Sequence, residues 1–230
     1  MAQRPNDGRC ATRVFVTGTG SSVVAGPAAD SSDADYTYWV TPPAEHIVVA
    51  RFIGIATDNL MLRPLSPAEL LALREGDAQF ADESGLKPTD GLRAMLVSDD
   101  VSPAWLARLR TAVDRDPWQF GYVVLETMTG VALGMASFKG PPDDQGVAEI
   151  AYGIVPAYRG RGYATQAAGA LVEYASADER VRRIRAHTLP ERNASTSVLT
   201  KNGFKLLGEV VDPEDGRVWR WERDADERFR

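Results

Sequence analysis

Apolar residues recur along this chain with two different periods, and each period marks segments expected to form helices or strands. The clearest signal is helical, because over residues 163–176 the apolar positions advance in steps of three residues and one residue. This stripe predicts a long amphipathic helix that buries one face. It consists of Ala164, Ala167, Ala168, Leu171, Val172 and Ala175.

Local signals extend the pattern over residues 57–223. Ser66-Pro67-Ala68-Glu69 is a capping box with proline at the first helical position, so a helix is expected to begin there. A second helix begins at Ser102-Pro103 with Leu106, Leu109 and Val113 on one face, and the Gly- and Asp-rich residues 76–101 are expected to form a long loop with room for a helical turn. The order β-α-α-β-β-β-α-β-α-β-β is an α/β (α+β) arrangement with one βαβ crossover. Strands are expected at 60–65, 120–127, 131–139, 147–155, 184–189, 206–211 and 218–221, and a short helix at 193–202.

The first fifty residues lack either period. The stretches 18–22 and 28–33 are small and polar, so residues 1–52 are expected to form a disordered tail. A secretory signal is not expected, because the arginines near the start are not followed by a continuous apolar run. The folded domain is therefore predicted at 53–224, followed by a charged segment at 225–230.

Composition narrows the classes of function. The chain is 44% hydrophobic and 25% charged, as is typical of a globular domain, and its net charge of −6 argues against sequence-independent binding to nucleic acid. No apolar run is long enough to span a membrane. The single cysteine, Cys10, cannot form an internal disulfide and indicates a reducing, cytoplasmic setting. Two histidines and one cysteine leave little material for a zinc site, so no metal is expected.

The joint before the long helix carries the clearest chemical signal. Arg159-Gly160-Arg161-Gly162 precedes the helix, and its glycines let the backbone approach a ligand while the helix start offers free N–H groups. Such a joint binds phosphate oxygens. It is neither the Walker pattern nor the dinucleotide fingerprint, because the following lysine and the required spacing are missing. A tight, solvated connection remains the plain alternative.

The context of this joint resembles a known family. Arg159, Gly162 and Ala164 fit the pattern Gln/Arg-x-x-Gly-x-Gly/Ala, which is the acetyl-coenzyme A motif of the GNAT superfamily of N-acetyltransferases. The resemblance covers about residues 57–223 and is closest to the RimJ/RimL-like branch, which acetylates ribosomal-protein N-termini. It rests on three strings, EIAYGIVPAYRGRGYATQAAGALVEYA, LPERNASTSVLTKNGF and DPEDGRVWRWE, in that order.

The resemblance implies a fold and an activity. The fold would be a mixed, mostly antiparallel twisted sheet that is splayed at a central bulged strand and flanked by helices. The activity would be transfer of an acetyl group from acetyl-CoA to a primary amine, on a small molecule or a protein N-terminus, by direct attack in a ternary complex. A monomer or homodimer is expected. A coenzyme A-binding, non-catalytic sensor or interaction module is the alternative, and a nucleotide-phosphate binder is a third.

The same resemblance implies which residues contact coenzyme A. The loop amides would bind the pyrophosphate, Arg159 and Arg161 would add charge, and the end of the preceding strand would offer backbone hydrogen bonds to the pantetheine arm. Asn193 is either a further cofactor contact or the cap of its helix. The complete set is Ile154, Val155, Arg159, Arg161, Gly162, Tyr163, Ala164, Thr165 and Asn193.

Two residues are candidates for catalysis. Glu149 would remove a proton from the acceptor ammonium, because amine acetylation needs a neutral amine; binding the cation by charge, or a structural salt bridge, are its alternatives. Ser195 matches the Ala-Ser pair of the branch and would donate to the coenzyme A sulfur, with a plain polar residue at the helix start as its alternative; Leu199 stands where the family's tyrosine falls. His187 is expected to be packed or hydrogen-bonded rather than catalytic. The acidic segment 76–101 either lines the acceptor site or is solvated.

Overall fold

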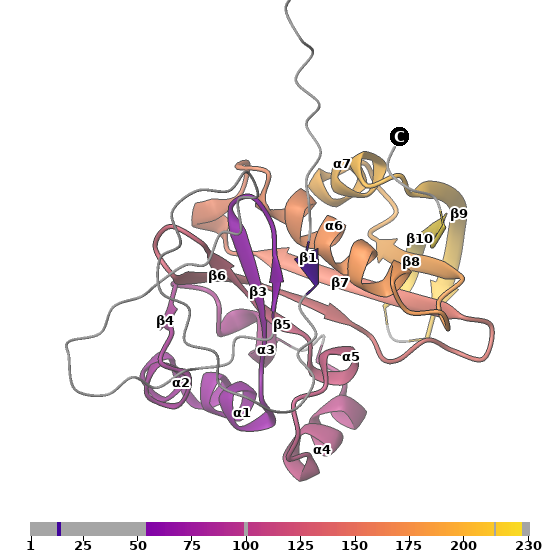
Figure 1. The fold of residues 1–230 in the computed structure, drawn as a ribbon. Helices are drawn as coiled ribbons and strands as arrows, with labels where there is room; N and C mark the ends of the chain where they lie inside the picture. The colour runs from indigo at the N-terminus through magenta and orange to yellow at the C-terminus, as the bar shows by residue number, and fades with distance from the viewer. Residues whose placement is uncertain (1–12, 15–53, 99–100, 214, 227–230) are drawn as a thin grey trace, which may run out of the picture.

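The computed structural model describes residues 13–14, 54–98, 101–213 and 215–226, which form one sheet with helices on both faces (Figure 1). The strands are β1 (Arg13–Val14), β2 (Ile55–Ala56), β3 (Leu60–Pro64), β4 (Lys87–Pro88), β5 (Tyr122–Glu126), β6 (Val131–Phe138), β7 (Val147–Ile154), β8 (Arg183–Thr188), β9 (Lys205–Asp212) and β10 (Gly216–Asp224). The helices are α1 (Pro67–Glu75), α2 (Asp77–Ser84), α3 (Ala94–Val97), α4 (Pro103–Thr111), α5 (Pro117–Phe120), α6 (Tyr163–Ser176) and α7 (Ala194–Lys201), with a 3₁₀ turn at Pro156–Tyr158.

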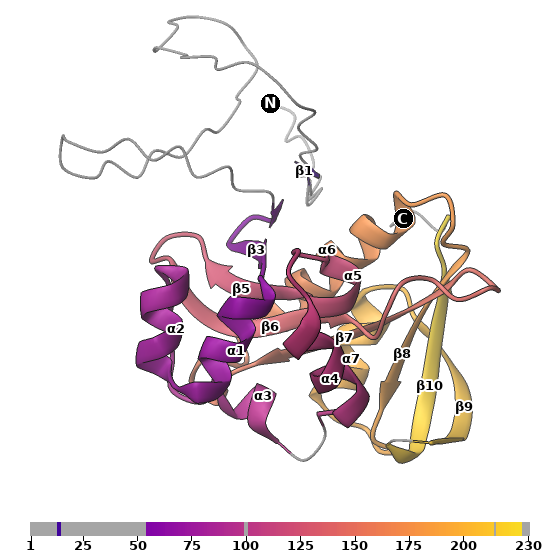
Figure 2. The same ribbon diagram turned by 90° about the horizontal axis from the view of Figure 1, so that it is seen from below.

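The sheet is mostly antiparallel. Its strand order is β1-β2-β3-β5-β6-β7-β8-β10-β9, and β4 pairs with β6 at the side of this path. The pairs β7–β8 and β4–β6 are parallel, and α6 is the crossover helix between β7 and β8. Helices α1 to α4 lie on one face of the sheet, and α6 and α7 lie on the other (Figures 1 and 2). The expected α/β fold class is confirmed.

The strongest local signals fold as predicted. Ser66 Oγ accepts from the Glu69 amide at 3.1 Å, and Glu69 Oε2 accepts from the Ser66 amide at 2.7 Å, so the capping box of α1 is complete. Along α6, the predicted stripe packs against β7 and the core, with Ala164 half-buried at its start. Its fully buried members are Ala167, Ala168, Leu171, Val172 and Ala175.

Two predictions about the segment before β5 are wrong. Residues 76–101 are not one long loop, because α2, β4 and α3 form within the described part of them and bury Phe80, Leu92 and Leu96. Each of these elements is too short to show a period of its own; α2 and α3 pack against α1, and β4 pairs with β6. Val113 does not lie on a helix face, since α4 ends at Thr111 and the Val113 side chain is 86% exposed.

Of the predicted tail, residues 1–52, the structure describes residues 13–14. Strand β1 pairs antiparallel with β2, placing Arg13 opposite Ala56; the rest of 1–52, including Cys10, and residues 227–230 lie outside the described residues. Across residues 54–98, 101–213 and 215–226, no helix combines the length and apolar character needed to cross a bilayer.

The sheet opens between β7 and β8. These strands pair over Val147–Glu149 and Arg183–Arg185, after which each continues without the other. In contrast, β7 keeps an unbroken register with β6 from Ile150 to Ile154. The recorded register shifts lie in the β5–β6 and β9–β10 pairs. The expected splay is therefore present, but it arises because the strands part and not because β7 bulges against β6.

Candidate active site

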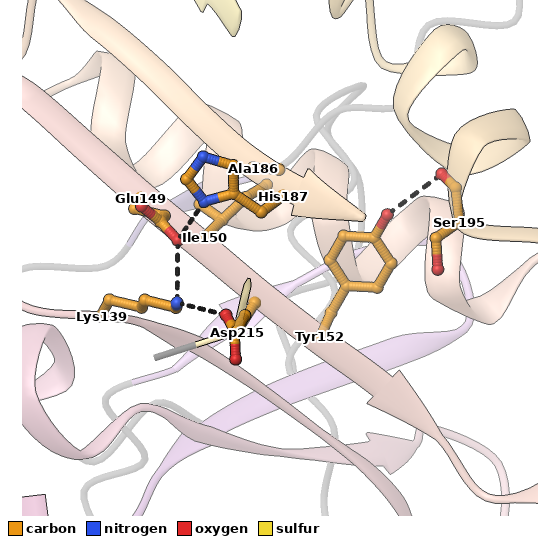
Figure 3. A pocket seen from close by; sticks show the side chains of 9 residues that line it. Lys139, Glu149, Ile150, Tyr152, Ala186, His187, Ser195 and Asp215 are labelled. Atoms are coloured by element: carbon orange, nitrogen blue, oxygen red, sulfur yellow. Dashed lines mark hydrogen bonds and ion pairs between the residues drawn. The ribbon is translucent and has the colours of Figure 1, made fainter. Parts of the chain in front are cut away.

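A cavity of about 170 Å³ occupies the opening between β7 and β8 (Figure 3). Side chains alternate along β7, so Glu149 and Ala151 face the side of α1–α4, whereas Ile150 and Tyr152 face the side of α6 and α7. The cavity therefore reaches both faces of the sheet through the gap. Its lining residues are Lys139, Glu149, Ile150, Ala151, Tyr152, Ala186, His187, Ser195 and Asp215.

Glu149 lies in this cavity and contacts two side chains, those of His187 and Lys139, that are distant from it in sequence. Its Oε1 atom lies 3.0 Å from Nδ1 of His187 and 3.2 Å from Nζ of Lys139. The salt bridge that was one alternative for Glu149 is therefore present, and it coexists with a position at the cavity wall. His187 is buried and hydrogen-bonded as expected, but its partner is the candidate base.

Lys139 is held between two carboxylates. Its Nζ also lies 3.0 Å from Oδ2 of Asp215, in the turn between β9 and β10. Burial by itself lowers the pKa of Lys139, but the hydrogen bond to Asp215 and the charges of Asp215 and Glu149 raise the pKa above its ordinary value. Lys139 is therefore a cation at neutral pH, and it offsets part of the negative charge on this side of the cavity.

Tyr152 and Ser195 meet on the opposite side of the cavity. The Tyr152 hydroxyl donates to the main-chain carbonyl of Ser195, in the first turn of α7, at 3.4 Å. Burial raises the pKa of the Tyr152 phenol, so its hydroxyl is protonated at neutral pH and can donate a hydrogen bond. Leu199 is fully buried in the core. The polar groups on this side of the cavity are therefore those of Tyr152 and Ser195.

Asn193 is the cap of α7. Its Oδ1 accepts from the Thr196 amide at 3.1 Å, while the Thr196 hydroxyl accepts from the Asn193 amide at 3.2 Å. These two bonds form a complete capping box, so the capping alternative is confirmed. The side-chain oxygen of Asn193 is thus already bonded within the helix, and Nδ2 is the side-chain group left for the predicted contact with the cofactor.

The glycine joint leaves its amides ready for an anion. Gly160 and Gly162 have φ of 77° and 83°, in the left-handed region that glycine adopts without strain, and Gly162 is the N-cap of α6. The first bond of the α6 ladder runs from the Gln166 amide to the Gly162 carbonyl at 3.1 Å. The amides of residues 162–165 precede it, so they point out of the helix start, where the helix dipole also favours negative charge.

The arginines of the joint bond to the protein itself. Arg159 Nε donates to the Ile154 carbonyl at 3.0 Å, and the Arg161 guanidinium stacks over Tyr158 with 4.9 Å to the ring centroid. These contacts hold the turn in shape. The groups that the joint offers to a ligand are consequently its main-chain amides, with guanidinium charge nearby.

The first turn of α6 is anchored by residues outside the motif. The Tyr163 hydroxyl donates to Glu126, and this hydrogen bond raises the pKa of the Tyr163 phenol. Gln166 Oε1 accepts from the Thr57 hydroxyl at 3.0 Å, which ties the same turn to the β2–β3 connection. Both contacts join segments far apart in sequence, so no local pattern predicts them.

The β7 residues whose main-chain groups face the opening differ from those predicted to contact the pantetheine arm. The Val155 amide donates to the Leu133 carbonyl at 3.0 Å, and the Val155 carbonyl accepts from the Tyr158 amide at 3.0 Å. Val155 is therefore bonded to β6 and to the following turn, which counts against its predicted contact with the pantetheine arm. Because hydrogen-bonding direction alternates along a strand, residues 152 and 154 direct their main-chain groups towards the opening. The two residues whose main-chain groups face the opening are therefore Tyr152 and Ile154.

These features define the class of protein. The site combines three features: a helix N-terminus suited to phosphate, a strand edge left open by the parting of β7 and β8, and a cavity with acidic groups on one side and hydroxyl groups on the other. Together they indicate a group-transfer enzyme. The acetyltransferase (GNAT) domain family matches residues 59–205, which is more than half of the chain. The chain belongs to the GNAT acetyltransferase family, and the expected enzyme class, acyltransferase, is confirmed.

Individual relatives agree with this assignment. The uncharacterised N-acetyltransferase YjdG of Bacillus subtilis is 35% identical over 74 residues, which cover 32% of this chain and 44% of YjdG. The chain thus spans less than half the length of this relative. Two solved structures share the fold. A ribosomal-protein-S5-alanine acetyltransferase from Vibrio fischeri has a TM-score of 0.52 and 14% identity, covering 76% of this chain and 98% of its own. RimL, a ribosomal-protein acetyltransferase in complex with coenzyme A, has a TM-score of 0.50 and 19% identity, covering 74% and 97%.

Proposed function

We propose that this protein transfers an acetyl group from acetyl-CoA to a primary amine by direct attack in a ternary complex. The observation that carries the proposal is the open cavity between β7 and β8, which has both Glu149 and Ser195 in its lining. An amine entering from the side of α1–α4 meets a carboxylate, while the groups suited to coenzyme A lie at the edge of β7 and at the start of α6.

The residues present fit acetyl-CoA. Its pyrophosphate matches the outward amides of Gly162, Tyr163, Ala164 and Thr165, because successive N–H groups at a helix start bind phosphate oxygens. Its amide-bearing arm matches the main-chain groups of Tyr152 and the amide of Ile154 at the opened strand edge, where the Ile154 carbonyl already accepts from Arg159. When bound, acetyl-CoA supplies the acetyl thioester. The protein supplies the binding edge, the orientation and the path for protons.

Glu149 handles the proton of the acceptor in this proposal. An ammonium cannot attack a carbonyl carbon, so an N–H bond must break and the proton must pass to a base. The Glu149 carboxylate is 19% exposed at the cavity, close enough to solvent to release the proton afterwards. The carboxylates of Asp215 and Glu149 attract a cationic amine, and the positive charge of Lys139 weakens this attraction. The Ser195 hydroxyl can donate a hydrogen bond to a developing thiolate on the far side, and the Tyr152 hydroxyl could do so only by giving up its bond to the Ser195 carbonyl.

The acceptor is proposed by class alone. RimL is named for acetylating a protein α-amine, which makes peptide N-termini the first acceptors to test, followed by polyamines and aminoglycosides. The acidic residues of α2 do not line the cavity; Asp77, Asp82 and Glu83 are exposed to solvent on that helix, as in the solvated alternative.

Release of free thiol from acetyl-CoA, measured across an amine panel, tests the proposal. We expect turnover with at least one primary amine, and Glu149→Gln should lower kcat about a hundredfold while leaving coenzyme A affinity unchanged. The residual rate should rise with pH, because more of the amine then arrives neutral. Glu209→Gln, which removes a carboxylate on the edge strand β9, is the matched control and should keep normal turnover.

Two outcomes would contradict the proposal in different ways. Binding of coenzyme A without thiol release for any amine would support a non-catalytic module. A Glu149→Gln enzyme with normal turnover from pH 6 to 9 would keep the enzyme class but remove Glu149 as the base.

A further inference from the structure

The two oxygens of Glu149 have different surroundings. Both polar contacts of this carboxylate, from His187 Nδ1 and from Lys139 Nζ, are made to Oε1 (Figure 3). Among the residues that the structure describes, no side chain or amide donates to Oε2. The carboxylate is thus held through one oxygen, and the other is left for a group from outside the protein.

His187 is the more rigid of the two donors. Its side chain is 7% exposed, whereas that of Lys139 is 39% exposed and shared with Asp215. Donation from Nδ1 to a carboxylate places the ring proton on Nδ1 and leaves Nε2 as an acceptor, which faces Nε of Arg220 at 3.5 Å. His187 is therefore fixed at both ring nitrogens.

The position of this contact along the strands also matters. Main-chain pairing of β7 with β8 ends at Glu149 and Arg185, and His187 lies two residues further along β8, where the strands have parted. The Glu149–His187 hydrogen bond consequently spans the opening directly beyond the last paired residues. It fixes the carboxylate at the edge of the cavity, where the backbone no longer does so.

We propose that His187 is a positioning residue for proton transfer. Its Nδ1–H, assisted by Lys139, holds Oε1 of Glu149, so that Oε2 is the oxygen that faces the acceptor. An N–H bond of the acceptor ammonium breaks, an O–H bond forms at Oε2, and the electron pair of the broken bond stays on nitrogen as the attacking lone pair. This inference rests on the proposed function, in which Glu149 is the base.

Steady-state kinetics of His187 variants in the full chain test the proposal. His187→Leu removes the donor, and His187→Asn keeps an N–H group near the position of Nδ1. We expect His187→Leu to lower kcat about tenfold with the KM for acetyl-CoA within twofold of normal, because the base is misplaced while the cofactor contacts remain. His187→Asn should recover most of the lost kcat.

A double-mutant cycle separates positioning of Glu149 from a general structural role. In the Glu149→Gln background, His187→Leu should change kcat less than twofold, since no proton-accepting oxygen remains to be positioned. An equal loss in both backgrounds, or normal kcat for both His187 variants, would overturn the proposal. If His187→Leu does not fold, the cycle is made with His187→Asn and His187→Gln, of which only the first should keep kcat near normal. Normal turnover of Glu149→Gln alone would instead be a failure of the proposed function.

Discussion

The glycine joint before α6 gives the sharpest quantitative prediction, because it contains its own control. Gly160 and Gly162 share nearly the same left-handed φ, 77° and 83°, and a Cβ added at either position would meet nothing within 4 Å. A valine at either site therefore strains the backbone while its Cβ lies in open space, and the strain should lower the free energy of unfolding by about 1–2 kcal/mol. For a chain of this size, that lowers Tm by roughly 2–4 °C per kcal/mol.

The two substitutions should differ in coenzyme A binding. Gly162→Val places a branched side chain beside the outward amides of α6, so coenzyme A affinity should fall tenfold or more, about 1.4 kcal/mol. Gly160→Val, two residues before the helix, should weaken binding less than threefold despite similar strain. Arg161→Ala should also have a small effect, since its guanidinium already stacks on Tyr158.

Isothermal titration with coenzyme A, accompanied by thermal unfolding of each variant, measures both quantities. Equal losses of affinity for Gly160→Val and Gly162→Val would show that loop conformation, and not access to the amides, controls binding. Normal affinity for Gly162→Val together with loss for Arg161→Ala would refute the reasoning, because the site would then depend on side-chain charge.

Three further predictions concern stability. Glu69→Gln should lower the free energy of unfolding, measured in urea, by at least about 2 kcal/mol, because the amide has no charge to offer the largely buried Arg63 and one acceptor oxygen where the carboxylate uses two. Tyr122→Phe should not lower that free energy at pH 7, since the buried Tyr122 hydroxyl has no partner among the described residues. Burial also raises the pKa of Tyr122, so wild-type stability should fall above pH 10 as the unfolded state ionises, and Tyr122→Phe should lose less over the same range. A chain beginning at Ala50 should melt within about 2 °C of the full chain, because the described part of the deleted segment is the two-residue strand β1; a larger loss would mean that the tail packs on the domain.

The long-range part of the candidate site could not be predicted from the sequence. Four charged or titratable residues of the cavity come from the end of β6, from β7, from β8 and from the β9–β10 turn, and they meet because those strands lie side by side in the sheet: Lys139, Glu149, His187 and Asp215. Nothing in the local sequence around His187 distinguishes a core histidine from a partner of a carboxylate. The sequence did favour a packed or hydrogen-bonded side chain for His187, and the structure shows its hydrogen bond to Glu149.

The direction of the main-chain hydrogen bonds along β7 was a second feature that the sequence could not predict. The motif correctly located the strand end at residues 154 and 155, but the direction of each amide depends on which neighbouring strand it faces. Val155 bonds to β6, so the opened edge belongs to Tyr152 and Ile154. A register shift of one residue exchanges these roles, and sequence patterns do not determine register to that precision.

By itself, the sequence determined the elements whose energetics are local. The Ser66–Glu69 capping box, the apolar stripe of α6, the Asn193 cap and the glycine-started helix each depend on residues within a few positions of one another, so their formation could be predicted. The tertiary structure decided the helices within 76–101, the parting of β7 from β8 and the contacts that hold Oε1 of Glu149. These features exist because segments distant in sequence pack against one another, and the free energy that stabilises them is absent from any isolated stretch of the chain.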